Sequence, residues 1–457
     1  MGAAYNSQER DPAPRCLPGT RKEILEQIEK WVKPGSKGKS ILWLHGPAGA
    51  GKSAIAQTIA EKCAGRDQLA ASFFFARTVP NRNSAKHLLQ TIAAQIALSV
   101  PEKRKMLDTI LKKDPCIAER ALGSVDLLVS LFQQGSALVP PSRFLVVIDG
   151  LDECQGRDEQ RRILAEVTRM VKTHRIPLRF LIVSRPEAHL CEAFEEPDLA
   201  NIAQILSLYG DLKAMNDVAK YLRGEFSRIH SSKRHRDVME FVPRPWLSKN
   251  VVDTLVTKSG GYFIYASTAI KFIDEEGFSP ADRLDQVLNT SDSTAFSSDS
   301  APFAELDKLY LQILSSYPTS KLPMFKRIVG YVVFPSVMGT SFMDTFGFLG
   351  VLDIEALLCL QRGKVKLMLR GLRSLVSFGG WENGTVTIYL NHASFGDFLH
   401  DKERSKDYHV DFEEWVHTAF YDALSLGCKV LGFSVDAGIQ SASSHPNGLS
   451  VTVTCFL

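Results

Sequence analysis

The sequence has no dense cysteine framework, and its opposite charges almost cancel. Its eight cysteines stand singly among 457 residues, without a CxxC pair. This excludes the disulfide frameworks of small secreted domains and favours reduced thiols in a cytoplasmic protein. The 54 Lys and Arg residues against 51 Asp and Glu leave a net charge of +3, so no strong footprint for nucleic acid or an anionic membrane surface is present. A chain of this length allows about three globular domains.

No segment has the features of a secretory leader or of a membrane span. The first residues, MGAAYNSQERDPAPR, mix charges and prolines without an apolar core. The most apolar stretch, 328–352, is interrupted by Pro335 and Asp344, so we expect buried helices there. Gly2 loosely matches a myristoylation signal, but Asn6 stands where Ser or Thr is required. We therefore predict neither a span nor a lipid anchor.

Short apolar segments alternate with helical patterns up to about residue 208. The pattern begins with a helix predicted from Thr20 to about Val32, in which Glu23 follows Thr20 at the spacing of a capping box. Alternation of apolar strands with amphipathic helices predicts an α/β fold with a doubly wound parallel sheet. The expected strands are 41–44, 71–76, 144–149, 178–184 and 202–208, and the expected helices between them are 53–64, 84–98 and 158–173.

Helical patterns dominate the rest of the chain, apart from a linker and a hairpin. A Ser- and Asp-rich stretch at 289–302 has the composition of a linker. Helices at 306–316 and 354–376 precede two strand-like segments around the turn 382–384, which predicts a winged-helix-like domain with a small β-wing. The expected parts are a flexible lead at 1–15, an α/β domain at 16–213, a helical lid at 214–288, the linker at 289–302, the winged-helix-like domain at 303–415 and an atypical tail at 416–457.

The segment GPAGAGKS at 46–53 matches the phosphate-binding pattern GxxxxGK[ST] at every fixed position. Its glycines let backbone N–H groups converge on phosphates, Lys52 neutralises the β- and γ-phosphates, and the Ser53 hydroxyl is a ligand for Mg²⁺. The alternative is a chance glycine-rich turn, but an apolar strand precedes the segment and a helical pattern follows it, as phosphate binding requires. The residues expected to hold the nucleotide are Gly46, Pro47, Ala48, Gly49, Ala50, Gly51, Lys52 and Ser53.

A second element, FLVVIDGLDE at 144–153, places three acidic residues after an apolar strand. Asp149 is expected at the carboxyl end of this strand, where it would hold Mg²⁺ through water. Either Asp152 or Glu153 would orient or deprotonate the water that attacks the γ-phosphate. The alternative is an acidic turn without a catalytic role, which the P-loop upstream argues against.

Two arginines follow other expected strands. Arg185 comes after Ser184, so its guanidinium is expected at the same sheet edge, where it would contact a γ-phosphate. A structural or surface arginine is the alternative. Arg77 follows the FFF segment and is a weaker candidate of the same kind, for which a solvated side chain is the favoured interpretation.

A basic run, RIHSSKRHR at 228–236, is the one segment with the composition of a nucleic-acid patch. It lacks the interleaved aromatic residues on which bases stack. We therefore interpret it as a solvated helix end or loop and predict no nucleic-acid partner.

Four segments, WLHGPAGAGKSAIAQTIA, ASFFFAR, FLVVIDGLDEC and LRFLIVSRPE, together resemble the NACHT branch of the signal-transduction (STAND) NTPases. The form is the one common in mushroom-type fungi, also described as the nephrocystin-3-like N-terminal domain. The small residue after Asp149, followed by the acid pair Asp152 and Glu153, is the most telling feature. The resemblance extends more softly over about 16–415, through SGGYFIYASTAIKFI of the helical lid and HASFGDFLHDKERSKDYHV of the winged helix.

The resemblance implies a nucleotide-regulated switch. ADP would hold the lid domains closed, and ATP would open them so that the protein forms a homo-oligomer, with slow ATP hydrolysis and an unidentified protein effector. His392 matches a winged-helix histidine that touches the β-phosphate of ADP, with a structural histidine as the alternative, and 18–20 would close over the adenine. A role in fungal innate immunity or self/non-self recognition would follow. The chain stops near the winged helix, where such proteins usually continue into a repeat sensor.

Two other functions are compatible with a P-loop. One is a catalytic NTPase or kinase with a separate substrate, although no acceptor motif is present. The other is an interaction scaffold whose nucleotide is structural. The sequence has no Asn/Thr-Lys-x-Asp motif for reading guanine, which favours ATP over GTP.

Overall fold

The computed structural model divides into two compact units, which are described separately. The first comprises Met1–Leu309 together with His392–Ser394, and the second comprises Tyr310–Asn391 and Phe395–Leu457. The residues that the structure describes are 2–10, 13–33, 38–77, 79, 82–99, 101–114, 123–133, 144–208, 213–243, 246–289, 304–315, 317–334, 349–380, 386–430, 434–435 and 453–454.

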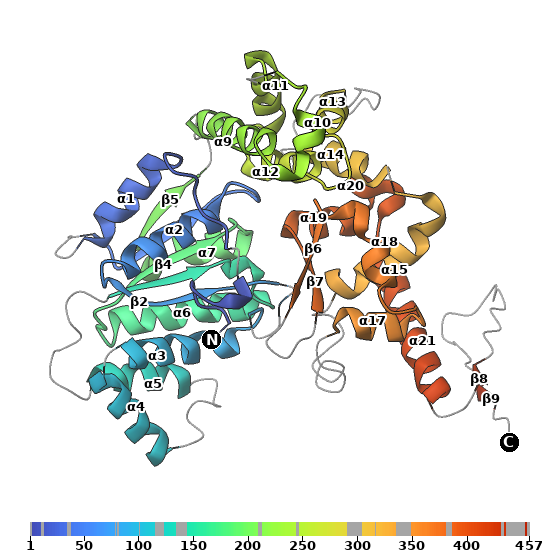
Figure 1. Ribbon diagram of the computed structural model, residues 1–457. Helices are drawn as coiled ribbons and strands as arrows, with labels where there is room; N and C mark the ends of the chain where they lie inside the picture. Colours follow the sequence, from blue (N-terminus) through green and yellow to red (C-terminus); the bar gives the residue numbers. More distant parts are fainter. Residues whose placement is uncertain are drawn as a thin grey trace. The chain divides into compact units, whose positions relative to one another are not determined.

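A five-stranded parallel sheet forms the centre of the first unit (Figure 1). Its strand order is β2-β3-β4-β1-β5, so the chain runs from β1 to one edge of the sheet and later returns to the other. All five expected strands are present, although β2 begins two residues earlier and ends two residues earlier than predicted. The strands are β1 Ile41–His45, β2 Leu69–Phe74, β3 Leu145–Asp149, β4 Arg179–Ser184 and β5 Ala203–Ser207.

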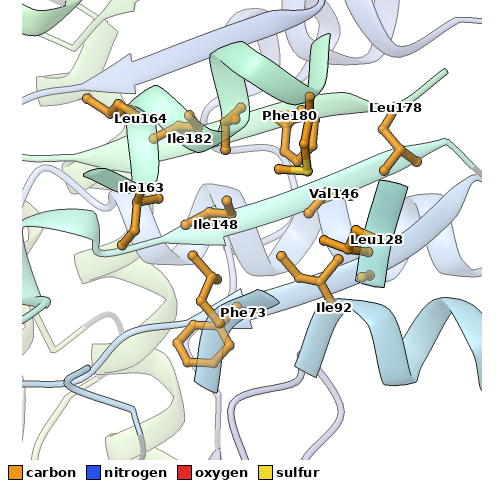
Figure 2. Close-up of a cluster of buried hydrophobic side chains, with 14 of the residues drawn as sticks. Phe73, Ile92, Leu128, Val146, Ile148, Ile163, Leu164, Leu178, Phe180 and Ile182 are labelled. Carbon is orange, nitrogen blue, oxygen red and sulfur yellow. The ribbon is translucent and has the colours of Figure 1, made fainter. Parts of the chain in front are cut away.

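Helices cover both faces of the sheet, which confirms the doubly wound fold. Side chains of a strand alternate between faces, so Leu42 and Leu44 pack with α1 and α2 while Trp43 lies in the opposite layer. Figure 2 shows that opposite layer, where Phe73, Val146, Ile148, Phe180 and Ile182 of neighbouring strands meet Ile92, Leu128, Ile163 and Leu164 of the covering helices. The helices of this α/β part are α1 Lys22–Val32, α2 Lys52–Ala64, α3 Leu88–Ser99, α4 Pro101–Lys113, α5 Gly123–Gln133, α6 Arg157–Lys172, α7 Ala188–Glu195 and α8 Pro197–Ala200.

A helical subdomain, α9 to α13, follows the sheet, as the sequence predicts for the lid. Its apolar faces bury residues such as Leu222, Leu255 and Phe272. The basic run falls on the end of α9 and the turn after it, where Arg228 pairs with Glu225 and Asp274. The helices are α9 Lys213–His230, α10 Arg236–Met239, α11 Lys249–Ser259, α12 Phe263–Ile273 and α13 Pro280–Leu288. Of the linker expected at 289–302, residues 290–302 lie outside the described residues.

One expectation for the amino-terminal region is wrong, and the lead makes specific contacts. The Phe74 N–H donates to the Ala3 carbonyl at 2.9 Å, and the Tyr5 N–H donates to Ser72 Oγ at 2.9 Å. The capping box at Thr20 is absent: α1 begins at Lys22, after Arg21 in the left-handed region with φ of 53°. Arg21 instead makes the long-range contacts described below.

The second unit combines helices with an antiparallel hairpin. The hairpin predicted as the β-wing is confirmed, with β6 Val376–Gly380 paired to β7 Val386–Leu390, while its turn at 382–384 lies outside the described residues. The single helix expected over 354–376 is wrong, because it is divided at Cys359 and Gly363, whose φ angles are 51° and 83°. The helices are α14 Ala304–Ser315, which spans both units, α15 Leu322–Val333, α17 Val351–Leu357, α18 Lys364–Met368, α19 Ala393–His400, α20 Lys402–Ser405 and α21 Phe412–Val430.

The tail is partly helical. The boundary expected at 415/416 falls within α21, which continues to Val430, and a short pair β8 Ser434–Val435 and β9 Val453–Thr454 follows. Of the helices in the described part of the chain, none has the length and apolar character needed to cross a membrane.

Candidate nucleotide-binding site

Strand register brings the predicted motifs to one edge of the sheet. His45, the last residue of β1, pairs with Ser184 of β4, and Asp149 of β3 pairs with Val183 of β4. The loop at 46–53, Asp149 and Arg185 therefore follow neighbouring strand ends. The strand order reverses between β1 and β4, and ligands of open α/β sheets bind outside the carboxyl ends of strands at such a reversal.

The loop at 46–53 leads directly into α2. Gly49 and Gly51 have φ angles of 73° and 84°, a region that other residues adopt at a cost. Helix α2 begins at Lys52, so its positive end and its first unpaired N–H groups face the loop. The ammonium of Lys52 donates to the carbonyl oxygens of Gly46 and Pro47, each at 2.8 Å. The loop thus has the backbone form of an anion cradle.

Burial and neighbouring charges set the protonation of Lys52. Removal from water lowers its pKa to about 8, and the carboxylates of Asp152, Asp149 and Glu153 oppose this shift while Arg185 adds to it. These four charges are close enough to influence the ammonium, so Lys52 and the predicted acids share one electrostatic environment. A phosphate in the loop would favour the charged ammonium further.

Asp149 is a buried carboxylate with an unused oxygen. It is 4% exposed, the Ser53 hydroxyl donates to it, and its Oδ1 has no hydrogen-bond partner. Burial raises the pKa of Asp149 to about 6, partly offset by Ser53, Arg10 and Lys52. A buried acceptor without a partner is costly, and a hard cation would satisfy it. Ser53 and Asp149 therefore fit Mg²⁺, which binds through one or two protein oxygens together with phosphate and water.

Both carboxylate oxygens of Asp152 contact Arg185. One oxygen, Oδ1, accepts the Arg185 main-chain N–H at 2.9 Å, and Oδ2 lies 3.3 Å from Arg185 Nε. Both side chains are largely buried. The carboxylate thus fixes the backbone and the guanidinium of Arg185 together, which is a positioning contact. The sequence left Asp152 and Glu153 as equal candidates for orienting water, and this geometry favours Glu153.

Glu153 occupies the end of a one-turn 3-10 helix, Leu151–Glu153, directly after β3. Its Oε2 accepts the main-chain N–H of Arg77 at 3.1 Å. Burial, followed by repulsion from Asp152, raises the pKa of Glu153 to about 7. A carboxyl group with a pKa near neutrality can exchange a proton with water at physiological pH, as a general base requires.

Sequence reasoning missed the residues that join the loop to other segments. The Ile264 N–H, at the start of α12, donates to the Gly49 carbonyl at 3.3 Å. Arg21 is 4% exposed, and its Nη2 donates to the Ala50 carbonyl at 2.8 Å while its N–H donates to Asp217 Oδ2 at 2.8 Å. No local motif marks these residues, since each is a single side chain or peptide group distant in sequence.

His392 lies between β7 and α19. Its Nδ1 accepts the Ser394 main-chain N–H at 3.0 Å and lies 2.8 Å from Ser394 Oγ. Because Nδ1 accepts a proton-bearing backbone group, the neutral ring carries its own proton on Nε2. The side chain therefore presents Nε2 as a donor.

Comparisons with known proteins find a family match for the first part of the chain. Residues 19–185 match the family described as Nephrocystin 3, N-terminal. No curated protein sequence matches significantly. Drosophila ORC bound to DNA is similar with 14% identity and a TM-score of 0.40, over 84% of this chain and 93% of that one. AMPPCP-bound DnaA from Aquifex aeolicus is similar with 13% identity and a TM-score of 0.34, over 79% and 88%.

A STAND protein with a tetratricopeptide repeat sensor from Pyrococcus horikoshii is similar with 14% identity and a TM-score of 0.42, over 91% of this chain. The match spans about half, 49%, of that protein's length. The family match contains the loop at 46–53 and the acids at 149–153, and it ends at Arg185. Residues 19–185 are therefore similar to the nephrocystin-3 N-terminal family, and the match includes the P-loop and the acidic segment that the sequence analysis singled out.

Proposed function

We propose that the chain binds ATP and ADP with Mg²⁺ and acts as a nucleotide-dependent oligomerisation switch that hydrolyses ATP slowly. The observation that carries the proposal is the direct contact between the P-loop at Gly49 and helix α12 of the helical subdomain. A loop that binds phosphate and also touches a separate helical layer can transmit the state of the nucleotide to that layer.

The residues of the loop have distinct tasks in binding. The N–H groups of 46–53 and the positive end of α2 would hold the α- and β-phosphates. Lys52 would turn from its contacts with Gly46 and Pro47 to the β- and γ-phosphates. Ser53 and Asp149 would hold Mg²⁺, which screens the charge of the phosphates and withdraws electrons from the bond to be cleaved.

Hydrolysis would depend on Glu153 and on the pair Asp152 and Arg185. Glu153 would accept a proton from the attacking water, since its raised pKa suits a base at neutral pH. Arg185, held in place by Asp152, would stabilise charge that develops on the γ-phosphate. Arg77 contributes through its main chain, by orienting Glu153.

The switch would act through the closure of the helical subdomain over the loop. Arg21 connects the Ala50 carbonyl with Asp217 of α9, and its guanidinium lies 5.3 Å from the ring centre of Phe263 in α12. The residues beside it, 18–20, would close over the adenine. His392 would donate from Nε2 to the β-phosphate of ADP and so stabilise the closed form.

The biological part of the proposal rests on the family resemblance. It comprises a cytoplasmic location, a homo-oligomer on activation, an unidentified protein effector and a role in fungal immunity or self/non-self recognition. No nucleic-acid partner is part of the proposal.

The test compares the wild type with Lys52→Ala and with the control Lys62→Ala. Lys62 lies on the same helix, is exposed and pairs with Glu29 at 2.7 Å. We expect wild-type and control protein to bind ADP and an ATP analogue and to gain mass in light scattering only with the analogue. Lys52→Ala should do neither. Wild-type protein that binds no nucleotide would refute the proposal. Nucleotide binding without any change of mass would refute the switch and favour one of the two alternatives, an interaction scaffold or a catalytic NTPase.

A further inference from the structure

Residues 2–10 are docked on the edge strand β2. Besides the bonds of Phe74 to Ala3 and of Tyr5 to Ser72, the Gln57 side chain of α2 donates to the Tyr5 carbonyl at 2.9 Å. Ala3 is 4% exposed and Gln57 is 1% exposed. The segment is therefore held beside β2 and α2: Ala3 packs in the layer shown in Figure 2, whereas Tyr5 packs on the opposite face of the sheet, which also carries the P-loop helix.

Two independent contacts place the Arg10 guanidinium beside Asp149. It lies over the ring of Phe74, 3.5 Å from the ring centre. Phe74 pairs with Asp149 in the parallel register of β2 and β3, and directly paired residues project to the same face. Arg10 Nη1 also donates to Gln57 Oε1 at 2.7 Å, and Gln57 lies one helical turn from Ser53, the partner of Asp149.

The hydrogen bonds that the Arg10 guanidinium makes to described residues all go to neutral groups. Among the described residues, no carboxylate lies within ion-pair distance of Arg10, whose bonds go to Gln57 and to the carbonyls of Ala4 and Tyr5. A second arginine, Arg82, is 9% exposed, and its Nε donates to the Phe74 carbonyl at 3.0 Å. Burial followed by the charge of Arg82 lowers the pKa of Arg10 to about 10, against the charge of Asp149. A desolvated, fixed cation that makes no ion pair with a described residue is suited to bind a further anion.

We propose that Arg10 is part of the nucleotide site and that its charge favours a nucleoside triphosphate over a diphosphate. This inference rests on the nucleotide binding proposed above. The loop holds the first two phosphates, whereas Arg10 lies on the Asp149 side, toward the third. A triphosphate carries one more phosphate to that position, so its affinity gains from Arg10 more than the affinity of a diphosphate does. Residues 2–10 thereby become a segment that distinguishes the two nucleotides.

The experiment measures the affinities of full-length protein for AMP-PNP and ADP by calorimetry at saturating Mg²⁺. Arg10→Gln keeps a polar group beside Gln57 and removes the charge. Arg66→Gln is the matched control, because Arg66 is exposed and pairs with Glu29 at 3.1 Å, away from Gln57 and Arg10. We expect Arg10→Gln to lower the preference for AMP-PNP over ADP about tenfold, the size of one charge-assisted contact. Arg66→Gln should leave the preference unchanged.

Arg10→Lys separates charge from packing, and its melting temperature and that of Arg10→Gln are measured alongside. We expect the lysine variant to retain most of the preference for AMP-PNP. The inference is overturned if Arg10→Gln binds both nucleotides with the wild-type ratio, if the lysine and glutamine variants lose the preference equally, or if loss of charge strengthens AMP-PNP binding by relieving repulsion of Mg²⁺. In each of these outcomes the proposed function stands. Wild-type protein that binds neither nucleotide overturns both.

Discussion

Gly49 and Ile264 lie in direct contact, with the Ile264 N–H donating to the Gly49 carbonyl at 3.3 Å. A Cβ atom at Gly49 would lie 2.0 Å from Ile264 Cγ2. The second residue of the α12 helix thus occupies the space that any side chain at Gly49 would need. The P-loop and the helical subdomain are therefore fitted to each other at this point.

Gly49→Ala is expected to separate the loop from α12. The substitution places a methyl group into Ile264 and requires a φ of 73°, a left-handed conformation that costs about 1–2 kcal/mol for residues other than glycine. We predict a lower melting temperature and faster release of bound fluorescent ADP, measured by stopped flow.

Gly65→Ala is the control for this prediction. Gly65 follows the same helix α2 at an ordinary φ of −64°, and its Cβ would meet only van der Waals neighbours at 3.6 Å or more. We expect little change in melting temperature or in the release rate. Equal effects of the two substitutions would argue against a specific contact between Gly49 and Ile264.

Glu153→Gln is expected to abolish hydrolysis while nucleotide binding persists. If Glu153 is the base, its carboxylate form is the active one, so kcat/KM for ATP should rise as pH increases through about 7, the pKa set by its burial. The residual rate of the glutamine variant should be flat over this range. A wild-type rate that stays constant from pH 6 to pH 8, or a glutamine variant with the same profile, would contradict the assignment.

The strands and both motifs could be predicted because each is specified by a pattern within one continuous segment of the sequence. A P-loop requires strand, glycines, lysine and helix in one continuous segment, and 41–64 provides them in order. The acids at 149–153 follow an apolar strand that is buried on both faces, which leaves an uninterrupted apolar run in the sequence.

The remaining contacts depend on long-range packing that no local pattern encodes. The expected cap at Thr20 is absent, and Arg21 before α1 instead donates its N–H to Asp217, 196 residues away. Arg10 reaches the site through Gln57, 47 residues away. Likewise, the sequence does not distinguish the roles of Asp152 and Glu153. Only the fold shows that Asp152 accepts the Arg185 N–H and that Glu153 accepts the Arg77 N–H.

Asp149→Asn is expected to stabilise the protein in EDTA without nucleotide. Folding raises the pKa of Asp149 from 3.8 to about 6, so the folded state binds this proton more tightly than the unfolded state. Binding of that proton stabilises the folded state fully below about pH 4, and this contribution is lost as pH rises through about 6. The free energy of unfolding changes by up to about 3 kcal/mol over this range, at 1.4 kcal/mol per pKa unit.

Asparagine has no charge to lose and can still accept from Ser53. Urea unfolding at pH 8 should therefore show the variant as more stable than the wild type, with the difference shrinking toward pH 4.5. Saturating Mg²⁺ and ATP should reverse the order, since only the wild type gains the full free energy of binding. A difference in stability that does not change with pH would show that the Asp149 carboxyl does not titrate as inferred.

His392→Ala is expected to weaken ADP binding about tenfold, the typical effect of losing one hydrogen bond to a charged group, and to affect AMP-PNP binding less. The Ser394 N–H donates to Nδ1, so on the neutral ring Nε2 would be the atom that donates to phosphate. His392→Gln offers an amide N–H at a similar reach and should restore part of the affinity. Ser394→Ala removes only the hydroxyl near Nδ1 and retains the orienting main-chain bond, so it should bind ADP almost as the wild type does. If calorimetry shows wild-type ADP affinity for His392→Ala, the histidine is structural.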